Sequence, residues 1–112
     1  MNFYKDGNSV LGLLSGSAEY LTEITANTND GAVEKHVPVY EVKDGNVCVK
    51  VGSAEHPMQE KHYIQWIAVE TNKGFYVKYL SPNEKPEACF TVDNEVIQTV
   101  YAYCNLHGLW EN

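Results

Sequence analysis

The sequence predicts an all-β protein whose strands form an antiparallel β-sandwich. About six short segments with strand-like alternation follow one another at a spacing of roughly 8–12 residues, which is typical of sandwiches. Eight tyrosines and frequent valines favour strands over helices. No segment carries the periodicity of an amphipathic helix. With 112 residues, the chain is long enough for one compact domain and too short for two large ones.

The expected strands are separated by polar turn signals such as Lys-Asp-Gly-Asn and Asn-Lys-Gly. Pro38 stands near the start of the first strand, which suits the edge of a sheet. In the second strand the valines alternate, so Val47, Val49 and Val51 should share one buried face. The expected strands cover residues 36–42, 46–51, 62–71, 74–80, 88–92 and 95–104, and residues 105–112 are expected to form a tail.

Residues 1–33 differ in composition from the rest of the chain. They are rich in Gly, Ser, Thr and Asn, and they contain no cysteine. Two short apolar runs, at 10–14 and 18–21, are candidates for a small hairpin. A two-stranded hairpin is marginal by itself, so we expect it to pack on the main domain or on a partner chain. The chain is therefore divided into an N-terminal segment, 1–33, and a main domain, 34–112.

Charge composition excludes several classes of partner. The net charge is −7 and the chain contains no arginine, whereas nucleic-acid-binding domains carry a basic stripe. Anionic membrane surfaces are disfavoured for the same reason, and no apolar run approaches the ~20 residues of a membrane span. If the substrate is an anion, the attraction must come from a local cation or from a metal.

The N-terminus and the cysteines favour a cytoplasmic protein. The first residues lack the basic region and apolar run of a secretory signal. The cysteines are Cys48, Cys89 and Cys104, and this odd number fits free thiols better than a disulfide framework. Cys48 and Cys89 lie within expected strands, where free cysteines are commonly buried and without function.

Four histidines are the most informative residues of the sequence. His36 begins an expected strand. His56 lies in a loop, and His62 begins the strand that follows it. His107 lies in the tail, three residues after Cys104. A single histidine in such a place is usually a solvated surface residue, but ends of strands are also where a rigid sandwich presents ligands. The spacing leaves a metal site and incidental histidines both open.

If a metal is bound, the donor types restrict its identity. Imidazole suits iron, copper, zinc and nickel, and a thiolate favours softer centres. Structural zinc takes four ligands, and five candidates are one too many. Four imidazoles and one thiolate would leave one position open. An open position opposite an electron-donating thiolate suits redox chemistry on a small molecule.

Three stretches around these residues resemble superoxide reductases of the desulfoferrodoxin and neelaredoxin family. They read EKHVPVYE at 34–41, HPMQEKHYIQWI at 56–67 and YCNLHGLW at 103–110. The similarity extends over about residues 30–110. The resemblance implies an immunoglobulin-like β-sandwich that holds one mononuclear iron, cycling between Fe²⁺ and Fe³⁺, in each chain. It also implies the activity of the family, which is one-electron reduction of superoxide to hydrogen peroxide without release of oxygen.

The resemblance assigns a role to each candidate ligand. His36, His56 and His62 match three equatorial ligands of the iron. His107, in the Cys-Asn-Leu-His-Gly motif, matches the fourth. Cys104 matches the axial thiolate.

Two more residues of the Glu-Lys-His motif match functional positions of the family. Lys35 is expected to attract the anion and to orient water that protonates the bound product. Glu34 precedes His36 by two residues, so in an extended chain both side chains point to one side. The carboxylate of Glu34 is then expected to bind the ferric iron after the product leaves.

Residues 1–33 resemble the small desulforedoxin-like domain of desulfoferrodoxins with its ligands missing. Without cysteine its tetracysteine iron centre cannot form, so a metal-free remnant is expected. The resemblance implies rubredoxin or a similar reductant as electron donor, and a homodimer is expected because the N-terminal hairpin gains most by packing across an interface. Three alternatives stay open: an iron-binding electron-transfer protein with the same site, a dismutase, and an immunoglobulin-like binding module with incidental histidines.

Overall fold

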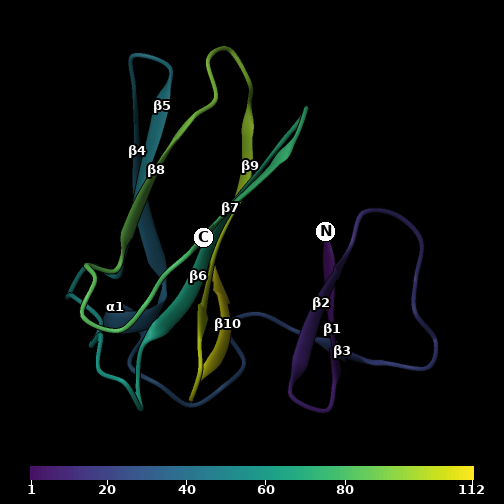
Figure 1. Cartoon of the computed structure of the whole chain (residues 1–112). Helices are drawn as coiled ribbons and strands as arrows, with labels where there is room; N and C mark the ends of the chain where they lie inside the picture. Colours follow the sequence, from purple (N-terminus) through teal and green to yellow (C-terminus); the bar gives the residue numbers. More distant parts are fainter.

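The computed structural model describes residues 1–112 as ten β-strands and one helical turn. All strand pairs are antiparallel, which confirms the predicted fold class. Figure 1 shows two sheets forming a sandwich and the N-terminal sheet beside them. The elements are β1 (Asn2–Asp6), β2 (Ser9–Leu13), β3 (Thr22–Ile24), α1 (Val33–His36), β4 (Pro38–Lys43), β5 (Asn46–Val51), β6 (Ile64–Thr71), β7 (Phe75–Tyr79), β8 (Glu87–Thr91), β9 (Ile97–Cys104) and β10 (Gly108–Glu111).

The sandwich consists of a four-stranded sheet, β10-β9-β6-β7, and a three-stranded sheet, β4-β5-β8. Val47, Val49 and Val51 of β5 are buried on one face, as their alternation predicts, and they share a core with Ile67 of the other sheet. Each such side chain contributes roughly 1.5–3 kcal/mol when it leaves water. β4 is an edge strand that begins at Pro38, as expected. No helix has the length and apolar character needed to cross a membrane.

The N-terminal sheet differs from the predicted hairpin. β2 pairs with β1, β3 pairs with the other side of β1, and residues 18–21 lie outside any strand. Asp6 pairs with Ser9, so two residues connect β1 to β2, and Gly7 adopts the positive φ (+60°) that such turns need. This turn sets the register of β1 and β2. Phe3 and Tyr4 are adjacent in sequence and both buried, so β1 does not show a simple alternation of buried and exposed residues.

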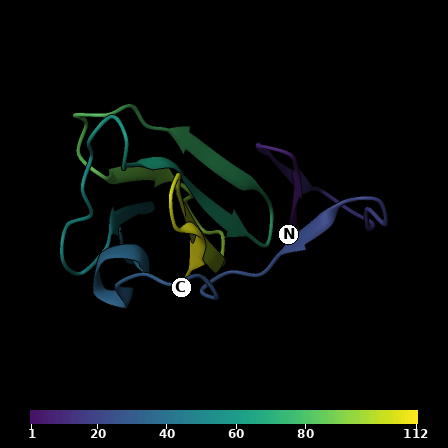
Figure 2. The ribbon, with the colours of Figure 1, turned by 90° about the horizontal axis from the view of Figure 1, so that it is seen from below.

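Aromatic contacts attach the N-terminal sheet to the sandwich, which is one of the two expected alternatives. The ring of Phe3 lies 5.0 Å from that of Tyr101 and 5.6 Å from that of Trp66, measured between centroids. The ammonium of Met1 forms an ion pair with Glu70 at 2.8 Å. In Figure 2 the N-terminal strands lie at one side of the sandwich and α1 at the other.

The connection from β3 to α1 runs along β10. The backbone N–H of Asn27 donates to the carbonyl of Leu109 at 3.0 Å, and the side chain of Asn27 makes two hydrogen bonds with the backbone of Glu111. The sequence predicts only a tail for residues 105–112, but β10 forms there because Gly108 takes a φ of +76° and turns the chain back onto β9.

Two of the three cysteines are not free, contrary to the prediction. Cys48 of β5 and Cys89 of β8 are directly opposite each other and form a disulfide. They are 41 residues apart in sequence, so their proximity depends on which strands pair and in which register. Both are exposed, whereas Cys104 is a buried free thiol.

Candidate metal centre

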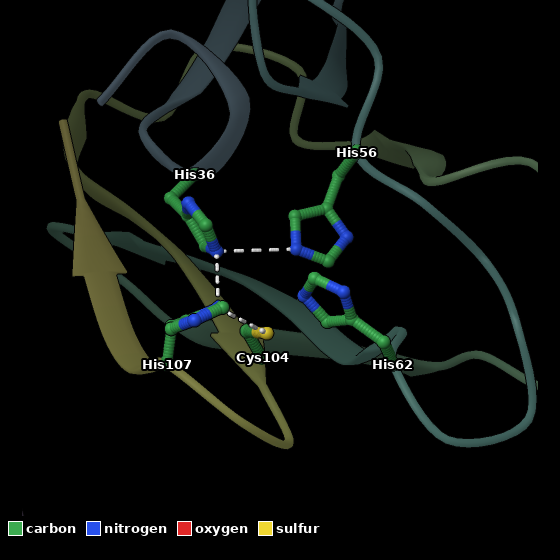
Figure 3. Close-up of side chains that lie close together, drawn as sticks. All are labelled: His36, His56, His62, Cys104 and His107. Carbon is green, nitrogen blue, oxygen red and sulfur yellow. Dashed lines mark hydrogen bonds between the residues drawn. The ribbon is translucent and has the colours of Figure 1, made fainter. Parts of the chain in front are cut away.

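All five side chains predicted to bind a metal converge at one end of the sandwich (Figure 3). Their candidate ligand atoms, one nitrogen from each imidazole and the thiol sulfur, all lie within 4.8 Å of one another. They come from five places in the chain: His36 ends α1, His56 lies in the loop after β5, His62 lies just before β6, Cys104 ends β9, and His107 lies in the turn before β10.

His36 is presented by a helical turn and not by the start of a strand. The N–H of Val37 donates to the carbonyl of Val33 at 3.0 Å, which closes the turn. Val37 itself is extended, as is usual before a proline, and β4 starts at Pro38. The prediction that Glu34 and His36 point to one side of an extended chain is therefore wrong, because residues two apart in a helix lie about 200° apart around its axis.

A clamp made by the loop after β5 holds this helical turn. The carbonyl of Glu34 accepts hydrogen bonds from the N–H of Ala54 at 2.8 Å and from the hydroxyl of Ser53 at 3.2 Å. A Cβ atom at Gly52 would lie 2.7 Å from the same carbonyl oxygen, so only glycine allows this approach. The loop continues to His56, whose N–H donates to the last residue of β5. Two ligand-bearing segments are thus fixed against each other.

His36 and His56 direct lone pairs at each other. The Nδ1 of His36 lies 2.8 Å from the carbonyl oxygen of Ala32, and the Nδ1 of His56 lies 2.7 Å from that of Pro57. Carbonyl oxygens only accept, so each Nδ1 carries the hydrogen and each Nε2 is unprotonated in the neutral ring. The two Nε2 atoms are 3.2 Å apart. Because no hydrogen is available between them, a cation is the partner that satisfies both.

The other three side chains complete the same cluster. The Nε2 of His62 is buried and has no hydrogen-bond partner in the protein. The Nδ1 of His107 lies 3.1 Å from the Nε2 of His36 and 3.7 Å from the sulfur of Cys104. Buried polar atoms are nearly always satisfied, so an unpaired imidazole nitrogen in a group of donors indicates a missing ligand.

Burial keeps the imidazoles in the form that binds metals. It lowers the pKa of His56 to about 4, against the opposing effect of the Pro57 carbonyl. Burial is also the main cause that lowers the pKa of His36 and of His62. These three rings are therefore neutral at pH 7, and a neutral imidazole donates its lone pair to a metal without first losing a proton.

The environment of Cys104 favours a metal-bound thiolate. Burial raises the pKa of its thiol, and backbone N–H groups of His107 and Leu106 act in the opposite direction by hydrogen bonding to the sulfur. A nearby metal cation deprotonates a coordinating thiol outright. The two amides then remain to stabilise the negative sulfur and to tune the metal.

Trp110 and Gly31 support the site and are not identified by the sequence analysis. The indole of Trp110 stacks on His36, with ring centroids 4.8 Å apart, and its N–H donates to the carbonyl of His107 at 3.0 Å. A Cβ at Gly31 would lie 3.1 Å from the His36 ring and 3.2 Å from the indole. The signal available in the sequence is the Trp two residues after the Cys-Asn-Leu-His-Gly motif, but nothing there indicates what it stacks on.

Glu34 and Lys35 are exposed residues of α1 and lie outside the ligand cluster. The charge of Lys35 nevertheless reaches the site. After burial and the neighbouring histidines, the ammonium of Lys35 is a further cause that lowers the pKa of both His36 and His62. Among the causes, the effect of Lys35 is the smallest on both histidines, and the carboxylate of Glu34 acts in the opposite sense on His36.

Comparison with known proteins agrees with this site. A family model described as desulfoferrodoxin matches residues 28–112. The chain belongs to the desulfoferrodoxin family. A desulfoferrodoxin of Syntrophotalea carbinolica is 46% identical over an alignment 112 residues long, gaps included, that covers 95% of this chain and 88% of that protein. A family member from Thermococcus kodakarensis, named superoxide reductase, is 34% identical over 79% of this chain and 92% of its own length.

Solved structures of desulfoferrodoxin relatives share the fold. The superoxide reductase of Treponema pallidum matches with a TM-score of 0.79 and 38% identity, over 95% of this chain and 80% of its own. The 1Fe superoxide reductase of Giardia intestinalis matches with a TM-score of 0.61 and 35% identity, over 70% of this chain and 95% of its own. The first match therefore extends into the N-terminal sheet, and the second covers a smaller part of the chain.

The donor set of this desulfoferrodoxin-family chain fits the mononuclear iron centre of superoxide reductases. Four imidazoles and one thiol provide five donors, one more than structural zinc takes. Nitrogen and sulfur donors suit iron in this combination. The facing lone pairs of His36 and His56 and the unpaired Nε2 of His62 are the observations that call for an ion.

Proposed function

We propose that this chain is a superoxide reductase that converts superoxide, with one electron and two protons, into hydrogen peroxide. The observation that carries the proposal is the convergence of four imidazoles and one thiol, with lone pairs facing inward, in a chain of the desulfoferrodoxin family. Relatives and matching structures bear the name superoxide reductase. Oxygen is not released, because every superoxide is reduced and none is oxidised.

The proposed ligands of a single iron are the four histidines and the free cysteine. His36, His56, His62 and His107 would supply nitrogen, and Cys104 would supply sulfur. An iron ion held by these residues would supply the electron that reduces superoxide. The protein keeps the imidazoles neutral by burial and fixes two of them through the carbonyls of the chain.

Lys35 is proposed as the cation that draws superoxide to the site. The net charge of −7 repels an anion at long range, so a local positive charge is needed. Lys35 is exposed on the helical turn that carries His36, and its charge is felt by His36 and His62. The same ammonium can orient water that delivers protons to the product.

Glu34 is proposed to act at the same position between turnovers. Its backbone is held by Ser53 and Ala54, so its carboxylate starts from a fixed point beside the site. Because Glu34 and His36 lie on different sides of the turn, the carboxylate must swing to reach the cluster. In this proposal the carboxylate of Glu34 binds the metal only between turnovers, whereas the four histidines and Cys104 bind it permanently.

We further propose that residues 34–112 form the catalytic domain and that residues 1–33 are a metal-free remnant. All five ligands lie in the first of these regions, and the N-terminal segment has no cysteine. Each superoxide consumes one electron, so a separate reductant is required, and rubredoxin or a similar one-electron carrier is the proposed donor. A cytoplasmic homodimer is the proposed working form.

The deciding experiment mixes the reduced, iron-loaded chain with pulsed superoxide and follows the reaction spectroscopically, with iron quantified on the same sample. A superoxide reductase yields one hydrogen peroxide for each superoxide consumed and no oxygen. An electron-transfer protein with the same site would react slowly under these conditions. A dismutase would release oxygen and turn over without a reductant. Either result would overturn the proposal.

A further inference from the structure

The disulfide between Cys48 and Cys89 lies on the open face of the β4-β5-β8 sheet. Side chains two apart in a strand share a face, so the neighbours of the disulfide on this face are the partners in register on the three strands. The face consists of Val39, Glu41 and Lys43 of β4, Asn46, Cys48 and Lys50 of β5, and Glu87, Cys89 and Thr91 of β8. Nearly all of these residues are exposed, so both sulfurs are accessible to small molecules and to proteins.

Opening this disulfide would leave the core intact. The opposite face of the same strands supplies the buried side chains, such as Val47, Val49 and Ala88. β5 and β8 are also paired from Asn46↔Thr91 to Lys50↔Glu87, two positions to either side of the cysteines. The backbone hydrogen bonds between β5 and β8 therefore keep the two thiols opposite each other after reduction. The disulfide can then form again without a rearrangement of the chain.

Cys48 lies beside an open hollow of about 360 Å³ that is also lined by Lys50 and Glu41. This hollow gives a small oxidant access to the sulfur. The ammonium of Lys50 favours a thiolate at Cys48, and the carboxylate of Glu41, which is directly opposite Cys48 on β4, acts against it. β5 continues from Cys48 to Val51 and the clamp that holds the metal site, over about 10 Å of extended strand. Cys48 therefore lies on the strand that leads into the loop that carries His56, close to the site where peroxide would form.

We infer that Cys48 and Cys89 form a reversible dithiol–disulfide pair that hydrogen peroxide oxidises and that a dithiol reductant, of the kind found in thioredoxin-like proteins, reduces. The inference rests on the proposed function only for the origin of the peroxide. It assigns a redox-active site that is separate from the five metal ligands. Exposed disulfides are generally the labile and regulatory ones, whereas structural disulfides resist reduction.

The chemistry balances without any other reactant. The Cys48 thiolate attacks one oxygen of the peroxide, the O–O bond breaks, and Cys48 becomes a sulfenic acid while water leaves after protonation. The Cys89 thiol then attacks this sulfur, the S–S bond forms, and a second water leaves. Two thiols and one hydrogen peroxide thus give one disulfide and two waters. The dithiol reductant restores both thiols by exchange and becomes a disulfide itself.

The test begins with the iron-loaded chain, reduced by dithiothreitol without oxygen and then desalted. One equivalent of hydrogen peroxide is added, thiols are alkylated after quenching, and the Cys48 and Cys89 peptides are mapped by mass spectrometry. We expect the two peptides to be linked in at least half of the chains and to be released by dithiothreitol in native buffer. Thiols that persist in a tenfold excess of peroxide, or a link that opens only after unfolding, would overturn the inference.

Two variants test the order of the steps. In Cys89→Ser the sulfenic acid on Cys48 has no partner, so dimedone should label Cys48 after peroxide treatment. In Cys48→Ser the labelling of Cys89 by dimedone should be at least fivefold lower than the labelling of Cys48 in Cys89→Ser. Labelling that is stronger on Cys89 would contradict the assignment of Cys48 as the attacking thiol.

A last arm separates this inference from the proposed function. The reduced chain is supplied with superoxide and a reductant, with and without catalase. Superoxide also forms some peroxide by spontaneous dismutation, so a Cys104→Ser sample treated in the same way gives the background. Closure that catalase prevents and that exceeds this background supports both ideas. Closure by added peroxide that does not exceed the background with superoxide supports the inference and counts against the proposed function. Failure with added peroxide counts against the inference alone.

Discussion

The N-terminal sheet and the metal-binding end of the sandwich differ in what their buried groups require. In the N-terminal sheet the buried side chains are Phe3 and Tyr4, and the ring of Phe3 gains stability from contact with the rings of Tyr101 and Trp66. At the metal-binding end, His36 and His56 are buried with their lone pairs facing each other. The first arrangement is complete as it stands, and the second is favourable only with a cation. Function is thus concentrated where the protein alone leaves polar atoms unsatisfied.

The largest expected effect that tests this contrast is the loss of the metal site in Cys104→Ser. We expect the oxidised protein to lose the thiolate-to-iron charge-transfer band and its reaction with superoxide to fall by at least two orders of magnitude, since a neutral hydroxyl replaces an electron-donating thiolate. Absorption spectra and pulsed superoxide measure both. The matched control is Cys48→Ser with Cys89→Ser, which should keep the band. A band that persists in Cys104→Ser would remove Cys104 from the ligand set.

A smaller effect is expected from Phe3→Ala, which addresses the other side of the comparison. Truncating this buried ring should cost about 3 kcal/mol and release the N-terminal sheet from Tyr101 and Trp66. Hydrogen exchange should increase in β1 to β3, while the iron content and the reaction with superoxide stay unchanged. Leu14→Ala, at an exposed position of the same segment, is the control. Loss of iron in Phe3→Ala would show that the two regions are coupled.

Lys35→Ala should slow the reaction with superoxide about tenfold at neutral pH, because the local attraction for the anion is lost. The iron content should not change, since Lys35 lies outside the ligand cluster. Added salt screens the attraction by Lys35, so the ratio of the wild-type rate to the variant rate should decrease as the salt concentration rises. Lys61→Ala, next to His62, is the control and should have a smaller effect. An unchanged rate constant in Lys35→Ala would exclude it from the reaction.

The smallest effect is expected at Glu95, which belongs to neither region. The hydroxyls of Thr71 and Tyr76 donate to its carboxylate and hold its pKa below the ordinary value. A depressed pKa stabilises the fold above the pKa of the unfolded chain, and this contribution is lost as the pH falls through the folded value. The stability difference between the wild type and Glu95→Gln should therefore shrink from pH 7 to pH 3. Thermal unfolding at both pH values measures it, and a constant difference would contradict this account.

The strands of the sandwich could be predicted from sequence because a buried face imposes a local pattern. Val47, Val49 and Val51 show this, and their burial follows from alternation alone. The disulfide could not be predicted in this way, since Cys48 meets Cys89 only through the pairing of two distant strands. Local pattern determines faces, whereas register is a property of the whole sheet.

The ligands could be predicted as a set, but their supports could not. The motifs around His56 and His62 predict both residues as ligands, and the structure places both in the cluster with the other three candidate ligands. The turn of α1 is too short to produce any periodicity, so His36 was expected at the start of a strand. Stacking of Trp110 on His36 joins segments 74 positions apart and leaves no trace in local sequence.

The facing nitrogens of His36 and His56 also bear on how the protein acquires its metal in a cell. A cluster of neutral imidazoles and a thiol that is already assembled binds copper and zinc at least as strongly as ferrous iron, following the general order of divalent affinities. Affinity alone therefore does not select iron. The five-donor set and the free ions present when the chain folds share the selection, so an excess of zinc in the growth medium would yield a correctly folded protein of which a part carries the wrong ion.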